Sequence, residues 1–557
     1  MSADPTAGVT CVLVPSMSDV PHTREGQPLL RPSQKYGSIL AAPVEGAAVG
    51  RGEANDASGE SFDNVPQVRR QLGLPSAAFL IFNRVIGTGI FATPSLILSS
   101  SGSVGVALLM WVLGALIAAA GTAVYVELGT GLPRNGGEKN YLEYMYRRPK
   151  FMVSCTYGIF TMISASTRNI VHALGFPATG FNTRLAALLC LTFCFVMIGV
   201  FNKWSLRLLN VLATFKFAIL AGIASLGLLS LAGVPGLAVR PSYEMPHNFA
   251  SWGALWAGSR RDSNSLITAL YNVIWSFIGY SDANYALSEV RDPVRTIKRA
   301  APLAIASLAT MYLLVNVAYF AVVSKNDILG SRQIIAALFF RNLFGPGTER
   351  ALSAFIAVST LGNILSVSFT QGRVVQELGR EGVLPLSAFF ATNKPFGAPL
   401  AGLTILYGIS LAGVVLPPPG DAYLFLISMT SYALALVNTL VSFGLLLLHT
   451  RAYRAWEWDP PFRAPHAVVV LFFASNVFLV LVPLIPPAPG ARAFEHIPYY
   501  MHVVVTIAAA QLGVVYWAVW SVWLPRRNGY TLKREWTLQD DGVSRFVFVK
   551  VPAPPPP

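Results

Sequence analysis

Apolar stretches of roughly 20 residues recur along most of this chain, and short polar segments separate them. A stretch of that length, coiled as an α-helix, crosses the ~30 Å hydrocarbon core of a bilayer. The pattern therefore predicts an all-α integral membrane protein with about 12 transmembrane helices. Their approximate ranges are 75–100, 104–131, 151–175, 185–202, 207–233, 265–290, 301–324, 350–375, 399–416, 421–449, 467–485 and 500–524.

The overall composition agrees with a polytopic membrane protein. Of the 557 residues, 54% are hydrophobic and 12% are charged, whereas a soluble domain carries about 25% charged residues. The mean hydropathy is +0.53. The net charge of +14 does not indicate nucleic-acid binding, because Lys and Arg lie mainly in the segments between the apolar stretches.

The two ends of the chain differ from the membrane region, which we place at residues 73–525. Residues 1–72 are rich in Gly, Pro, Ser and Ala, which is typical of a disordered tail. They lack the basic segment and apolar core of a cleavable signal peptide. Residues 526–557 form a polar C-terminal tail that ends in PAPPPP.

Basic residues favour one set of alternating loops. That set contains Arg134, Lys139, Arg147, Arg148, Lys203, Arg207, Arg291, Arg295, Lys298, Arg299, Arg373, Arg380, Lys394, Arg451, Arg454 and Arg463. The positive-inside rule places these loops in the cytoplasm. Because the predicted number of spans is even, both termini are expected there as well.

Small or polar residues interrupt two of the predicted spans. The first span contains IGTGIF (86–91), and the sixth contains WSFIGYSDANY (275–285). The interruptions are five spans apart, so they hold the same place in two successive five-helix units. Paired broken helices in corresponding positions indicate a transporter site between inverted repeats. We therefore predict a 5+5 inverted repeat with broken helices 1 and 6, followed by two extra helices.

An interrupted helix exposes main-chain N–H and C=O groups, which inside a membrane must line a cavity or a ligand site. A half-helix that begins at Gly89 presents N–H groups and a partial positive charge to a carboxylate. A half-helix that ends near Ile278 presents carbonyl oxygens to an ammonium group. Together the two breaks suit a zwitterionic amino acid. The alternative for Gly87, Thr88 and Gly89 is a close helix–helix contact without a ligand.

Three side chains adjoin the second break. Trp275 lies one turn before it, where an indole ring covers a bound ligand or gates its path; packing or anchoring at the membrane interface is the alternative. Ser281 and Asp282 follow the break. We interpret Asp282 as a cap on the second half-helix rather than as a substrate contact.

Lys216 is the most informative charged residue, because it lies inside the fifth span. An ionisable residue in a membrane helix costs ~2.5–3.5 kcal/mol on insertion scales and marks a functional site by default. We interpret it as a possible proton carrier. The alternative is that its side chain extends to the inner interface.

The remaining charges of the spans are interpreted as structural. Glu127 ends the second span near the cytoplasm, and Arg168 and His172 reach the outer interface late in the third. Arg84 is placed at the cytoplasmic start of the first span, opposite a carboxylate or a lipid phosphate.

No catalytic or metal-binding pattern is evident in the sequence. Among the cysteines, Cys11 lies in the tail, and Cys155, Cys190 and Cys194 lie in apolar stretches, with no histidine near the last two to complete a metal site. H-E-x-x-H, G-x-S-x-G and P-loop patterns are missing. We expect neither an enzyme nor a cofactor.

These motifs resemble those of the amino acid–polyamine–organocation transporters, in the L-type amino acid branch. The resemblance covers about residues 70–525 and rests on IGTGIF (86–91), ELGTGLPRNGGEKNYLEY (127–144), WSFIGYSDANYALSEVRDP (275–293) and QGRVVQELGREGVLP (371–385). Within this branch, GGEKNYLEYMYRRPKF (136–151) is most similar to the fungal methionine permeases.

The resemblance implies a set of site residues. It places the substrate carboxylate at Thr88, Gly89 and Ile90, and the ammonium group at carbonyls near Ile86 and Ile278. With the small residues of both breaks and the aromatic gate, the expected substrate contacts are Ile86, Gly87, Thr88, Gly89, Ile90, Trp275, Ile278 and Gly279.

The resemblance also implies a coupling site. Lys216 matches the fifth-helix lysine of sodium-independent relatives, whose ammonium occupies the position of a coupling sodium ion. Ser366 and Ser368 are the eighth-helix hydroxyls expected to face it. One departure concerns the loop FPATGFNT (176–183), which lacks the cysteine that joins related light chains to a glycoprotein. A disulfide-linked heavy chain is therefore not expected.

We expect a plasma-membrane permease that imports methionine, or a similar neutral amino acid, by alternating access with proton coupling. Two alternatives remain. One is a sodium- and proton-independent exchanger of neutral amino acids, and the other is a transporter-like receptor that signals without moving its ligand. The expected partners are the amino acid, protons and the lipid bilayer, and not nucleic acid.

Overall fold

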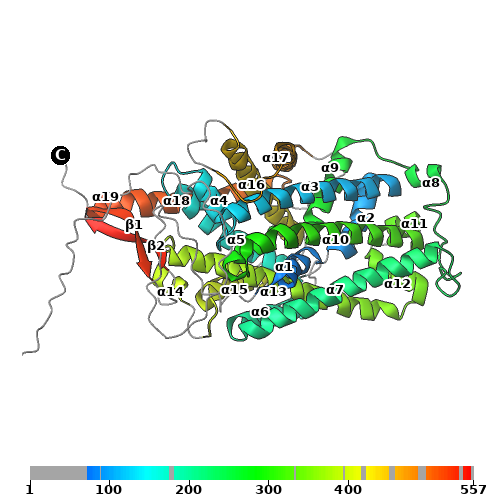
Figure 1. Cartoon of the computed structure of the whole chain (residues 1–557). Coiled ribbons are helices and arrows are strands. Elements are labelled where there is room, and N and C mark those ends of the chain that lie inside the picture. Colours follow the sequence, from blue (N-terminus) through cyan, green and yellow to red (C-terminus); the bar gives the residue numbers. More distant parts are fainter. Residues whose placement is uncertain are drawn as a thin grey trace, which may run out of the picture.

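Long helices running roughly along one axis make up most of the molecule (Figure 1). This computed structural model describes residues 72–87, 89–174, 181–330, 334–392, 396–415, 422–450, 458–486, 497–538 and 544–552. The short helices α8, α11 and α12 lie toward one end of the long axis, and α19 with strands β1 and β2 lies at the other (Figure 1).

The described helices follow the apolar stretches of the sequence. The first seven are α1 (Leu74–Val85), α2 (Gly89–Ser101), α3 (Val104–Gly131), α4 (Glu138–Met145), α5 (Met152–Leu174), α6 (Phe181–Gly199) and α7 (Asn202–Leu231). Next come α8 (Trp252–Trp256), α9 (Ser263–Ser276), η2 (Asp282–Glu289), α10 (Pro293–Val322), α11 (Lys325–Gly330), α12 (Ile335–Phe344) and α13 (Thr348–Arg380). The last are α14 (Ser387–Ala391), α15 (Leu400–Val415), α16 (Ala422–Leu448), α17 (His466–Leu481), η4 (Val482–Leu484), α18 (Met501–Trp517), η5 (Ala518–Trp523) and α19 (Leu524–Asn528).

The predicted membrane-spanning character is confirmed. Among the described residues, seven helices are long and apolar enough to cross a membrane, or up to eight if the bent pair α1 and α2 forms one span. Five shorter apolar helices accompany them, including Ser265–Ser276 and Leu400–Val415. The total of about twelve spans and the inverted repeat stay predictions.

Both predicted helix interruptions are present. Helix α1 ends at Val85, α2 begins at Gly89, and their axes differ by 46°. Helix α9 ends at Ser276, turns follow, and the 3₁₀-helix η2 continues from Asp282. Gly279 lies between them at φ +130°, a conformation that residues with a Cβ rarely adopt. The sequence therefore interrupts helix geometry at both sites through its small residues.

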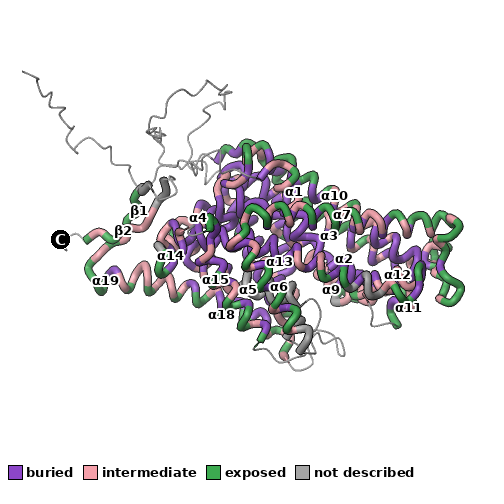
Figure 2. The backbone as a smooth tube through the Cα atoms, turned by 90° about the horizontal axis from the view of Figure 1, so that it is seen from below, coloured by how far each residue is buried: buried purple, intermediate pink, exposed green. Residues whose placement is uncertain are grey.

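The interrupted helices lie inside the bundle. Helix α1 packs against α7, α10 and α13, while α2 packs against α9. Trp111 of α3 and Tyr312 of α10 pack around Phe277 of the second break, with ring centroids 6.0 and 5.2 Å from the phenyl ring. In Figure 2 the buried residues lie mainly in the centre of the helix bundle, whereas the exposed residues lie on its outside. Both breaks are thus enclosed by protein rather than by lipid.

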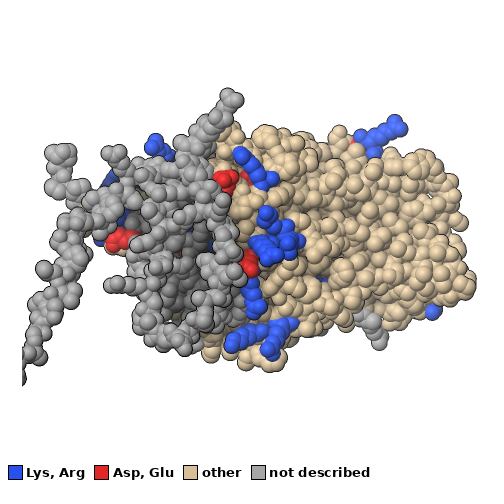
Figure 3. All heavy atoms as spheres, viewed as in Figure 1, with Lys and Arg blue, Asp and Glu red and all other residues tan. Residues whose placement is uncertain are grey.

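The outer surface is apolar along the helices. Leu116 of α3, Leu189 of α6 and Val211 of α7 each expose more than half of their surface. On the face shown in Figure 3, most of the visible Lys and Arg form a band across the middle of the molecule, and few lie on the part between this band and the end that carries α8. An apolar belt with charges concentrated toward one end is the distribution of a multi-pass membrane protein.

The C-terminal segment forms a β-hairpin. Strands β1 (Tyr530–Leu538) and β2 (Ser544–Pro552) pair antiparallel, with Tyr530 opposite Pro552. The ring of Phe548 packs against Phe151 at 4.5 Å and against Trp520 at 5.1 Å between centroids. The region predicted as a polar tail therefore contains a hairpin that contacts the start of α5 and the end of the last long helix.

Candidate functional site

The two helix breaks lie against each other. Gly89 opens α2, and a Cβ at that position would lie 3.2 Å from both the Trp275 ring and Ser276 Oγ of α9. A Cβ at Gly279 in the second break would collide with the side chain of Arg84 in α1. The first break therefore contacts the end of α9, and the second break contacts the end of α1. Glycine permits the close approach at both contacts.

Hydroxyl groups join α2 to α9 beside the breaks. Thr93 Oγ1 lies 3.0 Å from Ser276 Oγ and donates to the Gly89 carbonyl at 2.9 Å. Ser276 Oγ in turn lies 2.9 Å from the Asn272 carbonyl. Because these atoms are buried or partly buried, the bonds fix the start of α2 relative to the end of α9.

Lys216 of α7 lies at the first break. Its side chain is fully buried, and Nζ donates to the carbonyls of Ile86 at 2.7 Å and Asn83 at 3.1 Å. A Cβ at Gly362 of α13 would lie 3.1 Å from this Nζ. The ammonium thus sits between the carbonyl end of α1 and α13, and it does not extend to the membrane interface.

Side chains from three helices satisfy the last carbonyls of α1, which have no partner within the helix. Lys216 donates to the carbonyl of Asn83 and to that of Ile86, the residue that follows α1. Asn363 Nδ2 of α13 donates to the Arg84 carbonyl at 3.2 Å, and Tyr312 Oη of α10 donates to the Val85 carbonyl at 2.9 Å. The carbonyl end of the first break is therefore formed and held by the protein itself.

The predicted position of Arg84 at the cytoplasmic start of the first span was wrong. It lies in the last turn of α1 with only 5% of its surface exposed, and its Nη1 donates to Asn363 Oδ1 at 3.0 Å. Since α1 begins at Leu74, Arg84 is about 15 Å into the span, at 1.5 Å per residue. It lies beside the breaks and not at the cytoplasmic edge of the membrane.

Of the two serines of α13, Ser366 has other partners than the resemblance implied, and the role of Ser368 stays a prediction. Ser366 Oγ contacts Asp282 Oδ2 at 3.1 Å and the Leu80 carbonyl at 3.2 Å, while Ser368 is buried. Neither is among the described hydrogen-bond partners of Lys216. Gly362, one turn earlier in α13, takes the position against Lys216 instead.

Asp282 does not cap the half-helix in the way its position suggested. The residue before η2 is Ser281, which makes no side-chain capping bond. The Asp282 carboxylate accepts from Ser366 Oγ at 3.1 Å and from Thr370 Oγ1 at 3.4 Å. Asp282 therefore links the second break to α13.

Glu127 has the structural role that its sequence position suggested. The carboxylate is fully buried. Its Oε1 accepts from Trp458 Nε1 at 2.9 Å and lies 2.7 Å from His449 Nε2, and its Oε2 accepts from the Ala464 N–H at 2.8 Å. These contacts join the end of α3 to the segments around α16 and α17.

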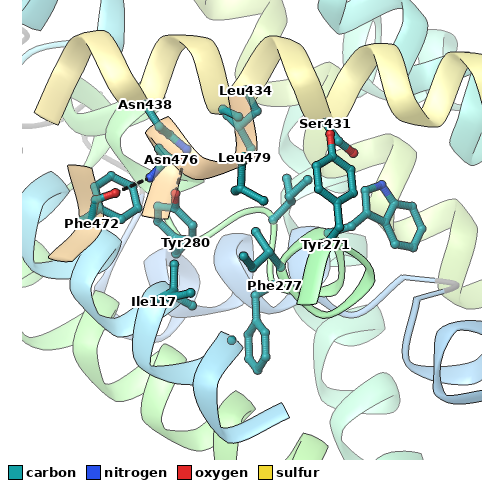
Figure 4. A pocket seen from close by; sticks show the side chains of 16 residues that line it. Ile117, Tyr271, Phe277, Tyr280, Ser431, Leu434, Asn438, Phe472, Asn476 and Leu479 are labelled. Carbon is teal, nitrogen blue, oxygen red and sulfur yellow. Dashed lines mark hydrogen bonds between the residues drawn. The ribbon is translucent and has the colours of Figure 1, made fainter. Parts of the chain in front are cut away.

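A cavity adjoins the second break (Figure 4). Residues of α3, α9, α16 and α17 line it, and Trp275 and Ile278 contribute from the break region. Asn438 and Tyr280 stand at one end, and Tyr271 and Ser431 at the other (Figure 4). Most of the lining is apolar, which suits an apolar substrate side chain.

Two hydroxyl groups of this lining have no hydrogen-bond partner among the described residues. They are Tyr271 Oη and Ser431 Oγ, both buried. A buried hydroxyl without a partner is costly, so each favours an acceptor inside the cavity. Trp275 contacts Gly89 and also lines the cavity, so it stands between the first break and this space.

Some expectations fall outside the described part of the molecule. Thr88 lies between two described segments, and residues 175–180 of the loop after α5 are likewise not described. The side chains of Arg168 and His172 are also outside it. The role of Thr88, the outer position of these charges and the expected lack of a heavy chain stay predictions.

Sequence reasoning missed three residues that hold the site: Asn83, Asn363 and Tyr312. Asn83 Nδ2 donates to the Leu209 carbonyl of α7 at 2.6 Å, beside its own carbonyl bond to Lys216. Asparagine inside an apolar span was the available signal, because a buried amide needs hydrogen-bond partners. Their partners are more than 100 positions away in sequence and could not be named from it.

Comparison with known proteins identifies relatives along most of the chain. A family described as "Amino acid permease" matches residues 72–508. The "High-affinity methionine permease" of Saccharomyces cerevisiae is 41% identical over 510 residues, which cover 90% of this chain and 88% of that protein. The "Low-affinity methionine permease" of the same yeast is 28% identical over 93% of this chain and 94% of its own length.

A human protein of the L-type branch is also similar. The "b(0,+)-type amino acid transporter 1" of Homo sapiens is 29% identical over 431 residues, which cover 75% of this chain and 83% of that protein. These matches confirm the resemblance that the motifs at the two breaks and in the loop after α3 indicated.

Proposed function

This chain belongs to the amino acid permease family, and we propose that it imports methionine, or a similar neutral amino acid, across the plasma membrane together with protons. Amino acid transport and membrane insertion follow from the family and from the apolar helices. The substrate, the coupling and the membrane are the proposed parts. Methionine is supported by the 41% identity to a yeast protein named as a methionine permease.

The contact between the two breaks carries the proposal for the site. The substrate carboxylate binds main-chain N–H groups at Gly89 and Ile90, where the partial positive charge of α2 is greatest. The ammonium group binds carbonyls near Ile86 and Ile278. The Ile86 carbonyl accepts from Lys216 at 2.7 Å and from Ser359 Oγ at 3.5 Å, and a substrate ammonium group would replace the longer of these two bonds.

The apolar cavity receives the side chain of the substrate. Its lining of Leu, Ile and Phe suits a thioether, which is apolar and polarisable. The hydroxyls of Tyr271 and Ser431 can donate to sulfur, a weak acceptor. When a substrate occupies both the first break and the cavity, Trp275 moves away from Gly89. Its indole ring therefore acts as a gate.

Lys216 couples the first break to the transport cycle. Its ammonium contacts two carbonyls at the end of α1 and lies against α13. A change in its charge or position would therefore alter the carbonyl end of the first break. Alternating access then moves the two broken spans relative to the helices around them. The band of Lys and Arg lies on the hairpin side of the nearly charge-free surface that extends toward α8, which supports a cytoplasmic location for the hairpin end and for both termini (Figure 3).

Replacing Gly89 by valine tests the site. The new side chain would overlap Trp275 and Ser276, which lie 3.2 Å from its Cβ position, and would cover the N–H groups of α2. Overpacking of this kind costs about 1–3 kcal/mol, equal to a roughly 5- to 150-fold effect, and because the N–H groups are covered as well we expect methionine uptake to be abolished. Surface expression should persist.

The matched control is Gly222→Val in α7, where no heavy atom lies within 4 Å of the Cβ position. That variant should transport normally. Normal uptake by Gly89→Val would remove the first break from the site.

Uptake into proteoliposomes distinguishes the alternatives. Import driven by a pH gradient into vesicles without internal amino acid supports proton coupling. Strict dependence on internal amino acid would indicate an exchanger. Binding of methionine without any flux would indicate a receptor. Competition of labelled methionine uptake by the common amino acids tests the substrate.

A further inference from the structure

A buried carboxylate lies below the cavity, outside the site described above. Glu138 of α4 exposes 1% of its surface. Its Oε1 is 2.9 Å from Tyr125 Oη of α3 and 2.8 Å from Tyr285 Oη of η2, and its Oε2 is 3.0 Å from Tyr157 Oη of α5. Four elements therefore meet at one carboxyl group.

The titratable groups around Glu138 are mainly phenols. From the packed elements these groups are Tyr125 of α3, Tyr141 of α4, Tyr157 of α5, Tyr280 of the second break and Tyr285 of η2. The adjacent Lys139 pairs with Glu143 and Glu381, and α16 contributes the uncharged Asn438. Arg134 faces Tyr141 from the loop before α4. The hydrogen-bond partners described for the carboxyl oxygens are thus neutral hydroxyls.

A line of hydrogen bonds connects Glu138 to the cavity. Tyr125 Oη is 2.8 Å from Asn438 Oδ1, and Asn438 Nδ2 is 3.0 Å from Tyr280 Oη. Asn438 and Tyr280 both line the cavity, and Figure 4 shows their bond at one of its ends. Glu138 is therefore linked to the cavity through three side chains.

Counting protons shows that this line has two complete arrangements. Tyr125 has one hydroxyl proton but contacts two acceptors, Glu138 Oε1 and Asn438 Oδ1. In the first arrangement, Glu138 is protonated and donates to Tyr125, Tyr125 donates to Asn438 Oδ1, and Asn438 Nδ2 donates to Tyr280. The Tyr280 hydroxyl proton is then free to point at an acceptor in the cavity.

In the second arrangement, Glu138 has lost one proton and the Asn438 amide has turned by 180°. Asn438 Nδ2 now donates to Tyr125, Tyr125 donates to the Glu138 carboxylate, and Tyr280 donates to Asn438 Oδ1. Every bond of the line is kept, and the two arrangements differ by one proton on Glu138. The Tyr280 proton no longer faces the cavity.

From this geometry we propose that Glu138 binds the co-transported proton, and that Asn438 couples its protonation to an acceptor in the cavity through Tyr280. A substrate with an acceptor atom at the Tyr280 end of the cavity favours the protonated arrangement. By linkage, a proton on Glu138 favours that substrate equally. The inference rests on the proposed proton coupling, but it does not depend on Lys216 being a proton carrier.

Glu138→Gln is the principal test, because glutamine keeps the shape of the protonated carboxyl and its amide can donate to Tyr125. Purified wild type and variant are reconstituted in proteoliposomes. We expect the variant to exchange internal for external methionine, but to lose methionine-driven proton uptake and accumulation under a pH gradient. Methionine binding should tighten at lower pH in the wild type and be independent of pH in Glu138→Gln.

A pair of tyrosine variants provides the matched comparison. Tyr125→Phe and Tyr157→Phe each remove one hydroxyl from Glu138, but only Tyr125 lies on the line to Asn438. We expect Tyr125→Phe to lose the dependence of methionine binding on pH, and Tyr157→Phe to retain it. This comparison also decides the question if Glu138→Gln is not recovered as folded protein.

The outcomes separate the two proposals. A wild type without methionine-driven proton flux would overturn proton coupling itself, and this inference with it. A coupled wild type whose Glu138→Gln variant retains proton flux and the pH dependence would overturn only the inference. Equal behaviour of Tyr125→Phe and Tyr157→Phe would also contradict the route through Asn438.

Discussion

Replacing Lys216 by alanine removes the donor that holds the carbonyl end of the first break. Nζ donates at 2.7 Å to Ile86 and at 3.1 Å to Asn83, and both carbonyls are buried. A buried polar group without a partner costs about 1–3 kcal/mol, and this cost falls on the Asn83 carbonyl, because the Ile86 carbonyl keeps a contact from Ser359 Oγ at 3.5 Å. Removing a buried ammonium offsets part of this cost, because its desolvation penalty disappears.

The effect on transport should exceed the effect on folding. The breaks contact each other through Gly89 and Gly279, so a loosened carbonyl end of α1 disturbs the substrate site directly. We expect Lys216→Ala to retain some methionine binding but to lose accumulation under a pH gradient. For one proton per substrate, a gradient of one pH unit supports about tenfold accumulation, equal to ~1.4 kcal/mol. The variant should reach a ratio near one.

The assay is uptake of labelled methionine into proteoliposomes at a fixed inward pH gradient, with counterflow measured on the same preparations. Lys298→Ala is the matched control, since Lys298 also donates to a carbonyl, that of Pro461, but at the surface. Lys298→Ala should accumulate methionine as the wild type does. Undiminished methionine accumulation by Lys216→Ala would refute a coupling role for Lys216, and its role would then be structural.

Two further substitutions test how the breaks are built. Tyr312→Phe removes the donor to the Val85 carbonyl, but this carbonyl keeps a bond from the Gly87 N–H at 2.9 Å. We therefore expect the free energy of unfolding to fall by about 1 kcal/mol, measured as a small drop in apparent Tm in detergent. Gly279→Ala forces a Cβ into φ +130° and against Arg84, so we expect a loss of about 2–4 kcal/mol and a large drop in apparent Tm. A Gly279→Ala protein with wild-type Tm would contradict the close contact of the two spans.

The helix breaks could be predicted because their cause is local. Glycine and polar residues interrupt apolar stretches at 86–91 and 275–285, and the helices end there. Lys216 could likewise be interpreted as functional from its local sequence, because placing a charge inside a membrane span is costly. The burial of this lysine and its bonds to two carbonyls agree with that reasoning.

The partners of these residues could not be predicted, because they depend on the rotation of neighbouring helices. Residues 362–380 of α13 are all buried, so its polar positions face other helices rather than water, and their pattern does not reveal which face meets α7. Ser366 was therefore expected where Gly362 lies. Arg84 was misplaced for a related reason, since its partner Asn363 is 279 positions away.

The carbonyl end of the first break does not need a substrate to be stable inside a membrane. Lys216, Asn363 and Tyr312 come from three different helices and already supply donors to the last three carbonyls of α1 and to that of Ile86, which follows it. Unwound backbone at membrane depth is tolerated when protein groups satisfy it. A site formed in advance requires little ordering when the ligand arrives. We therefore expect substrate binding to leave α1 in place and to move the indole of Trp275, which contacts Gly89 on one side and the cavity on the other.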